Sequence, residues 1–399
     1  MRKWSLLLLL FLTAACSPAA VETTSVAIVT AAPTATQQPP TATATEQATV
    51  APTATLTPTI TPNPTATATA TLAPTATPLP LVTFTTTLPI QERLLLASEL
   101  PVIEREPGKR YLNAGAVIYH DGMYHSFANF FNSWPGETVT YYYSSPDGQT
   151  WTRVQPEPLF TIADVPLEGR GALVLSGLVT AEGQWVLYYH TFTASSAPGQ
   201  IGRATAPAPA GPWTFDPEPA LSPGGEGAWD ELQVMRVNVL SAADGYVMYY
   251  AGVNRQQESR IGLAYSADGI SWQKYDDPAT TTAPYAESDP ILEPALEWEN
   301  GWLGRPEVVQ TADGWVLLYE GGRSGSRTGL AVSQDGINFI RYEGNPILTR
   351  DNMVAGYTFF QGAFFHQDDT YFYLIEAGNG PVGTDIFLYR LNGALLAED

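Results

Sequence analysis

From residue 83 onward, apolar and aromatic runs alternate with short polar turns in a pattern that recurs along the chain. Each unit has an apolar run, a tight turn and a second run rich in β-branched and aromatic residues. These second runs are 122–127, 185–189, 246–250, 315–319 and 371–375. Such runs joined by turns like Asp121-Gly122 predict β-hairpins. No stretch longer than a turn or two has helical periodicity, so the pattern predicts an all-β fold.

A repeated phrase, Ser-x-Asp-Gly-x-x-aromatic, sets the size of the repeat. It occupies 145–151, 266–272 and 333–339, with a degenerate copy at 210–213. In it the Asp accepts from nearby backbone amides and the Gly takes the left-handed conformation, so Asp147, Asp268 and Asp335 are predicted to be structural. A period of about 60 residues with roughly four strands per repeat predicts a five-bladed β-propeller. Residues 83–112 would supply the strand that closes the ring.

The N-terminal part of the chain differs sharply in composition. Residues 1–15 contain Arg2-Lys3, an apolar run too short to span a bilayer, and small residues before Cys16, which resembles a bacterial lipoprotein signal. The alternative is an ordinary secretory peptide with an incidental Cys. Residues 16–82 are nearly all Thr, Ala and Pro and predict a disordered stalk. We therefore expect 83–399 to form one propeller domain, exported and held at the surface of a bacterial cell by a lipid on Cys16.

Charge narrows the classes of partner. The chain has 19 Lys+Arg against 40 Asp+Glu, a net charge of −21, which argues against nucleic acid and against contact with anionic lipid beyond the N-terminal anchor. No zinc-ligand spacing, phosphate-binding Gly-rich loop or Gly-x-Ser-x-Gly elbow is found, so we expect no metal and no cofactor. The sequence does not decide whether a calcium ion sits on the propeller axis. We expect a monomer.

Functional side chains in a propeller gather where first strands begin and second strands end. Counting back nine residues from the hairpin glycines 122, 245 and 314 places polar residues at one apparent depth, and strand ends and loops add more. The candidate substrate-binding residues are Asn113, Trp134, His190, Arg236, Arg305, Glu320, Gln361 and Glu376. Amides, guanidinium groups and carboxylates among aromatic rings suit sugar hydroxyls and pyranose faces. Carbohydrate is therefore the expected partner.

Glycosidic bond cleavage needs a pair of carboxyl groups. The expected catalytic pair is Glu307 with Asp230 or Glu231. Each residue also has a structural interpretation. Arg236 and Arg305 can pair with carboxylates to join blades, and Glu307 can be such a partner. Asp230 and Glu231 can cap a turn, and His190 can be a buried structural histidine.

These hairpins, with their Ser-x-Asp-Gly-x-x-Trp and Gly-Pro-Trp turns, resemble the five-bladed propeller glycosidases of the arabinanase/xylosidase, invertase and mannoside-phosphorylase groups, over residues 100–399. The resemblance implies a glycoside hydrolase or phosphorylase that uses carboxylate acid/base catalysis on an oligo- or polysaccharide. Arabinanase-like members carry an Asp base at the start of the first blade, where this chain has Asn113-Ala114-Gly115. The phosphorylase branch holds phosphate with Arg residues, a role open to Arg236 and Arg305. The alternatives are a carbohydrate-binding propeller that has lost the first-blade Asp and an adhesion module on a stalk.

Overall fold

A computed structural model describes residues 79–82, 88–192, 199–323, 327–353, 357–367, 370–378, 382–392 and 395. The predicted signal peptide, Cys16 and nearly all of the stalk lie outside these residues. The described residues fall in one compact unit, Pro74–Asp399. None of its helices is long and apolar enough to cross a membrane.

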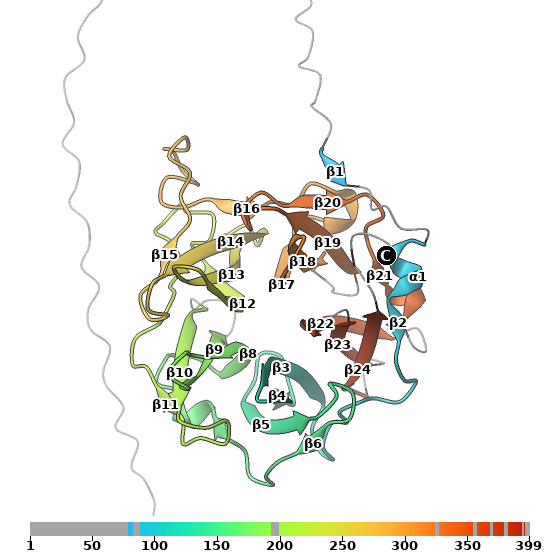
Figure 1. Cartoon of the computed structure of the whole chain (residues 1–399). Helices are drawn as coiled ribbons and strands as arrows, with labels where there is room; N and C mark the ends of the chain where they lie inside the picture. The colour runs from blue at the N-terminus through green and yellow to red at the C-terminus, as the bar shows by residue number, and fades with distance from the viewer. Residues whose placement is uncertain are drawn as a thin grey trace, which may run out of the picture. The chain divides into compact units, whose positions relative to one another are not determined.

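Five sheets are arranged around a central axis, which confirms the predicted five-bladed propeller (Figure 1). Blade 1 consists of β3 (Tyr111–His120), β4 (Met123–Phe131), β5 (Thr138–Ser145) and β6 (Thr152–Arg153). Blade 2 consists of β8 (Gly171–Val179), β9 (Trp185–Phe192), β10 (Ile201–Ala206) and β11 (Thr214–Phe215). Blade 3 consists of β12 (Gln233–Ala242), β13 (Gly245–Val253), β14 (Ser259–Ser266) and β15 (Gln273–Lys274).

Blade 4 consists of β17 (Leu303–Thr311), β18 (Gly314–Gly321), β19 (Arg327–Ser333) and β20 (Ile340–Tyr342). Blade 5 consists of β22 (Thr358–Gln367), β23 (Thr370–Gly378), β24 (Thr384–Asn392) and β2 (Leu95–Leu96). The remaining described elements are β1 (Leu81–Val82), α1 (Ile90–Arg93), β7 (Phe160–Thr161), η1 (Ile162–Asp164), β16 (Pro290–Leu292), η2 (Glu297–Glu299), β21 (Leu348–Thr349) and η3 (Arg350–Asn352).

The start of the domain closes the ring, as the sequence predicts. β2 pairs antiparallel with β24, so that Leu95 lies opposite Arg390, and becomes the outer strand of blade 5. β1 adds in parallel to β20 at the outer edge of blade 4. The boundary predicted at residue 83 thus falls just after a short strand that already belongs to the propeller.

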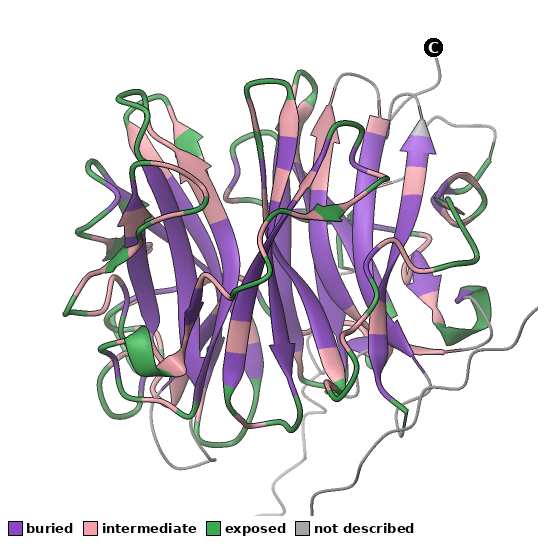
Figure 2. Cartoon of the chain, turned by 90° about the horizontal axis from the view of Figure 1, so that it is seen from below, coloured by how far each residue is buried: buried purple, intermediate pink, exposed green. Residues whose placement is uncertain are grey.

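The core lies between the blades. Five clusters of buried side chains each fill one interface between neighbouring sheets, for example Phe127 and Tyr142 of blade 1 against Trp185 and Leu187 of blade 2. Figure 2 shows the strands mostly buried, with exposed residues concentrated in the turns at both ends. Because the inner strands are covered on both faces, their sequences read as nearly continuous apolar runs. Polar residues on these strands therefore stand out.

The repeated Ser-x-Asp-Gly phrase forms turns between the third and fourth strands. Asp335 accepts the amides of Ile337 (2.9 Å) and Asn338 (2.8 Å), and these bonds hold the pKa of Asp335 well below its usual value. Each such turn in blades 3 and 4 also binds the preceding blade, because Tyr188 donates to the carbonyl of Gly269 (2.7 Å) and Tyr249 to that of Gly336 (2.9 Å). The phrase is therefore a structural device.

Every first strand contains a β-bulge close to the axis. The register shifts between Asn113 and Ala116 in blade 1 and at the corresponding place in the other four blades. In blades 3 and 4 the first residue of the bulge is Arg236 (φ 55°) and Arg305 (φ 50°), respectively. Both take the left-handed conformation. Bulges bend a strand and re-aim its side chains, and they are common beside functional sites.

The bulges correct one expectation. Counting from the hairpin glycines places Asn113 level with Arg236 and Arg305. In the structure Asn113 is the last residue before its bulge, so it lies one register position earlier than the two arginines. The count fails because Gly122 lies in its two-residue turn, whereas Gly245 and Gly314 already begin the next strand.

Candidate functional site

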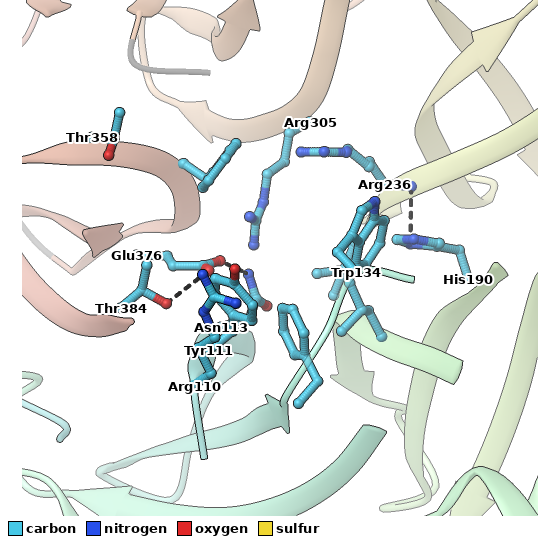
Figure 3. Close-up of a pocket in the computed structure, with 14 residues that line it drawn as sticks. Arg110, Tyr111, Asn113, Trp134, His190, Arg236, Arg305, Thr358, Glu376 and Thr384 are labelled. Carbon is cyan, nitrogen blue, oxygen red and sulfur yellow. Dashed lines mark hydrogen bonds between the residues drawn. The ribbon is translucent and has the colours of Figure 1, made fainter. Parts of the chain in front are cut away.

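A pocket of about 490 Å³ opens at the end of the propeller where the first strands begin (Figure 3). All five blades or their adjoining loops contribute to it. Its lining residues are Arg110, Tyr111, Asn113, Phe131, Trp134, Leu173, Leu175, His190, Arg236, Arg305, Thr358, Phe360, Glu376 and Thr384. A concave, largely apolar site with a few converging polar groups is typical of small-molecule binding.

Glu376 is the carboxyl group in this lining. It is 5% exposed, and burial raises its pKa, opposed by the nearby charge of Arg305. Thr384 donates to its Oε1 (3.0 Å) and the Asn113 amide donates to its Oε2 (3.4 Å). Asn113 is itself oriented, because its Oδ1 accepts the amide of Gly115 (3.0 Å). The site thus holds a positioned carboxyl group that favours its protonated form more than an exposed glutamate does.

His190 and Arg236 form a second group on the pocket wall. The backbone amide of Arg236 donates to Nδ1 of His190 (3.3 Å), which places the ring proton on Nε2. Burial, and then the charges of Arg236 and Arg305, lower the pKa of His190 to about 3. The Arg236 guanidinium binds Glu320 (2.8 Å), which is 2% exposed and does not itself line the pocket. His190 is therefore a neutral hydrogen-bond donor at neutral pH.

Arg305 is 4% exposed and runs into the middle of the site in Figure 3. Its Nε and Nη2 atoms have no hydrogen-bond partner among the described residues. Burial and the charge of Arg236 lower its pKa, while Glu307, Glu376 and Glu320 act in the opposite direction. A buried polar group without a partner is costly, which makes Arg305 a strong candidate for ligand contact.

Trp134 supplies an aromatic wall. It lies in the loop after β4, is 51% exposed, and packs on Phe192 with ring centroids 4.2 Å apart. Tyr111 and Phe131 stack nearby at 5.3 Å between centroids. Exposed aromatic faces beside polar groups provide the stacking surface that a sugar ring uses.

Glu307 lies elsewhere along the axis. It lines a second cavity of about 290 Å³, formed farther along the first strands, and is 4% exposed. Burial raises its pKa to about 8, opposed first by the charge of Arg305. Its Oε2 accepts the amide of Phe364 in the next blade (3.4 Å).

Two other blades repeat this contact. Ser176 and Asn238, which also directly follow their bulges, accept amides of the next blade from Val239 (2.7 Å) and Val308 (3.1 Å). Glu307 therefore makes one of three equivalent hydrogen bonds between neighbouring blades, and it does not line the pocket.

Asp230 lies on the outer side of blade 3, away from the pocket. Its carboxylate is fully buried and binds Lys274 (2.6 Å), the Tyr250 hydroxyl (3.2 Å) and the amide of Gly224 (3.1 Å). Trp229 stacks on Tyr250, with ring centroids 5.8 Å apart. All of these partners are structural.

Blade 4 repeats the same arrangement. Glu299 binds Arg341 (2.7 Å) and accepts from the Tyr319 hydroxyl (2.8 Å), and Trp298 stacks on Tyr319. Trp229-Asp230 and Trp298-Glu299 are thus copies of one phrase, Trp followed by an acidic residue. That repeat was readable in the sequence and would have separated Asp230 from the catalytic candidates.

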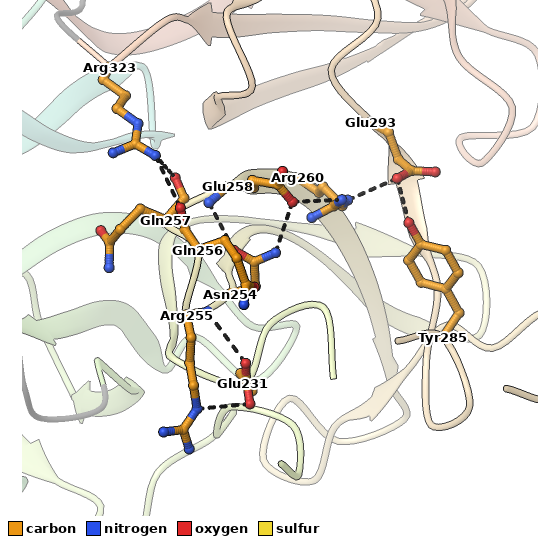
Figure 4. Close-up of polar contacts among 10 residues, drawn as sticks. All are labelled: Glu231, Asn254, Arg255, Gln256, Gln257, Glu258, Arg260, Tyr285, Glu293 and Arg323. Atoms are coloured by element: carbon orange, nitrogen blue, oxygen red, sulfur yellow. Dashed lines mark hydrogen bonds and ion pairs between the residues drawn. The ribbon is translucent and has the colours of Figure 1, made fainter. Parts of the chain in front are cut away.

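Glu231 belongs to a surface network that joins the upper loops of blades 3 and 4 (Figure 4). It binds Arg255 (3.0 Å) and accepts the amide of Gly227 (2.8 Å), and the latter bond contributes most to lowering its pKa. Arg323 reaches the same loop through the carbonyl of Gln257. Glu231 is not among the residues that line the pocket.

Of the predicted site residues, the pocket brings together Asn113, Trp134, His190, Arg236, Arg305 and Glu376. Glu320 adjoins it through Arg236. Gln361 is fully buried, and its amide has no hydrogen-bond partner among the described residues, but it lines neither cavity. The sequence missed the other lining residues, most of which are apolar or small and gave no signal: Arg110, Tyr111, Phe131, Leu173, Leu175, Thr358, Phe360 and Thr384. No group of three or more metal-ligating side chains occurs within the described part of the chain.

Comparison with solved structures places this fold among propellers described as glycoside hydrolases. A glycosyl hydrolase from Bacteroides ovatus is 16% identical, with a TM-score of 0.59 over 79% of this chain and 98% of that one. A putative glycoside hydrolase from Parabacteroides distasonis is 19% identical, with a TM-score of 0.56 over 76% and 97%. A member of the GH130 family of mannoside phosphorylases and hydrolases is 18% identical, with a TM-score of 0.56 over 78% and 99%.

At these identities the likeness shows a shared five-bladed fold. No family model and no curated protein matches the chain.

Proposed function

We propose that the pocket binds a carbohydrate and cleaves a glycosidic bond, with Glu376 as the proton donor. The observation that carries this is a buried, oriented carboxyl group with a raised pKa, in a pocket walled by Trp134. Such a carboxyl group is suited to act as a general acid near neutral pH. The propeller glycosidases that share the fold support the same reading.

The chemistry requires two proton transfers. Glu376 gives its proton to the leaving oxygen as the bond from that oxygen to the anomeric carbon breaks. Water adds its oxygen to the anomeric carbon and releases a proton, which a second carboxylate must accept. We assign that role to Glu320, which Arg236 holds beside the pocket. Asn113 and Thr384 keep the Glu376 carboxyl group in position.

A second candidate is a carbohydrate-binding propeller without catalysis. One observation favours it: Glu376 is the only carboxyl group among the described residues that line the pocket. The resemblance to arabinanase-like enzymes implies a carboxylate base at the start of the first blade, where this chain has Asn113. In either case the leader and the Thr/Pro/Ala-rich segment support the proposal of an exported protein, anchored through Cys16.

The test compares the full-length protein with Glu376→Gln on a panel of plant, fungal and bacterial glycans. Released reducing ends and glycan binding are both measured, with and without inorganic phosphate. Glu376→Gln should lower the rate by about 10²- to 10⁴-fold and leave binding largely intact. Glu231→Gln is the matched control, because Glu231 lies outside the pocket, and it should keep the wild-type rate.

Binding without release by the wild-type protein would select the binding-only function. Release that depends on phosphate and yields a sugar phosphate would show that phosphate, and not water, attacks the anomeric carbon. Glu320 would then not be needed as a proton acceptor. An equal rate for Glu376→Gln and wild type would refute the assignment of the acid.

A further inference from the structure

One edge of the Arg305 guanidinium is buried without a hydrogen-bond partner among the described residues. Nε and Nη2, the two atoms without a hydrogen-bond partner among the described residues, lie on the same side of the planar group. Together they form a fork that matches two oxygens of one carboxylate. The residue is 4% exposed, so water does not readily compensate for the missing partners.

His190 offers a further unused donor. It is 2% exposed, its Nδ1 is occupied by the Arg236 amide, and its Nε2 has no hydrogen-bond partner among the described residues. Since Nδ1 accepts, Nε2 carries the proton and can only donate. The pocket therefore has two buried side chains, Arg305 and His190, whose donor groups lack acceptors among the described residues.

The charge of the lining points in the same direction. Arg110, Arg236 and Arg305 line the pocket with one carboxyl group, Glu376, whereas the whole chain has a net charge of −21. Glu320 balances Arg236 at 2.8 Å, but no carboxylate in the described residues makes an ion pair with Arg305. Guanidinium groups thus outnumber carboxyl groups in the lining itself, although Glu307 and Glu320 lie near Arg305 outside it, and this lining favours an anionic occupant over a neutral one.

We propose that the sugar recognised here is a uronic acid, whose carboxylate accepts from Nε and Nη2 of Arg305 while Nε2 of His190 donates to another oxygen of the same sugar residue. This rests on the proposed carbohydrate-binding function and specifies its substrate class. A planar carboxylate presents two oxygens to the fork and carries the charge that the lining lacks. The aromatic wall at Trp134 would then contact the ring.

The test measures binding, so it does not depend on turnover. Full-length protein is titrated calorimetrically with D-glucuronate and D-galacturonate, with their methyl esters, with glucose and galactose, and with inorganic phosphate and sulfate. A uronate should bind at least about 10-fold more tightly than its methyl ester, because esterification removes the charge-assisted pair. Neutral sugars should bind no better than the esters.

Arg305→Lys keeps the charge and removes the fork, and it should abolish most of the preference for uronate over ester. Arg350→Lys, at an exposed residue on η3, is the charge-matched control and should leave the preference unchanged. Circular dichroism and thermal melting check that each variant folds. If Arg305→Lys does not fold, His190→Phe provides the second variant and should weaken uronate binding.

Equal affinity for uronate and methyl ester would overturn the proposal. Binding of phosphate or sulfate that uronate does not displace would also overturn it, and would assign the fork to a free oxyanion. Uronate binding without any cleavage would support the inference while refuting the enzymatic function. Cleavage of neutral glycans alone would support the enzymatic function and refute the uronic acid inference.

Discussion

The buried ion pair between Asp230 and Lys274 gives the sharpest test of which carboxylates are structural. Asp230 is fully buried and binds the Lys274 ammonium at 2.6 Å, together with the Tyr250 hydroxyl. Asp230→Ala leaves that ammonium, whose side chain is 16% exposed, without a counter-ion. Removing one member of a buried pair typically costs about 3–5 kcal/mol.

The corresponding change in melting temperature can be estimated. Unfolding entropy is about 2.1 cal/mol/K per residue, so a unit of roughly 320 residues has about 0.7 kcal/mol/K. A loss of about 3–5 kcal/mol then lowers the Tm by about 4–7 °C. Calorimetry and urea unfolding measure this directly.

Two controls make the result specific. The double variant Asp230→Leu with Lys274→Met removes both charges and should recover most of the loss, because an apolar pair of similar size replaces a buried ion pair well. Glu231→Ala breaks a pair whose Arg255 side chain is 65% exposed and should lower the Tm less than Asp230→Ala does. An unchanged Tm for Asp230→Ala, combined with lost activity, would refute the structural assignment and return Asp230 to the site.

Three further predictions concern the axis, the turns and the pocket. Glu307→Gln should stabilise the protein relative to wild type increasingly between pH 4.5 and 8, by at most about 1.4 kcal/mol per pH unit. The reason is that the unfolded carboxyl group ionises near 4.5 and the folded one only near 8, so wild-type stability falls as pH rises through that window. Urea unfolding at pH 5, 7 and 9 measures this, and a difference independent of pH would contradict it. Tyr249→Phe should cost about 1–3 kcal/mol in the same assay because the buried carbonyl of Gly336 loses its donor; no loss would mean that water replaces it. Trp134→Ala should leave the Tm unchanged and weaken glycan binding by about 2- to 10-fold by titration, and unaltered affinity would remove Trp134 from the site.

The repeat made the fold predictable, because a period of about 60 residues with hairpins and Asp-Gly turns fits few architectures. Depth along the axis was harder to predict. Counting from the hairpin glycines placed Asn113 level with Arg236, although it lies one register position earlier, because the sequence does not show that Gly122 lies in its turn while Gly245 begins the next strand. Glu376 was found as a strand end, but its partner Thr384 was not.

The sequence also does not separate structural carboxylates from functional ones. Asp230 and Glu376 are both buried acidic residues next to aromatic neighbours, and only their partners distinguish them: an ammonium and a tyrosine for Asp230, neutral donors for Glu376. Partners of this kind come from strands distant in the chain. A single sequence without its folded contacts does not reveal them.

Closure of the ring by β2 also determines when folding can be completed during synthesis. Leu95 pairs opposite Arg390, so the ribosome must add nearly 300 residues before the partner of β2 exists. At about 5–20 residues per second this is a wait of roughly 15–60 s. Until then four blades can form, but β2 has no partner strand and the ring is open. During synthesis the domain therefore depends on its two-residue strands being too short to pair stably with other strands. A protein truncated just before β24 would not close the ring.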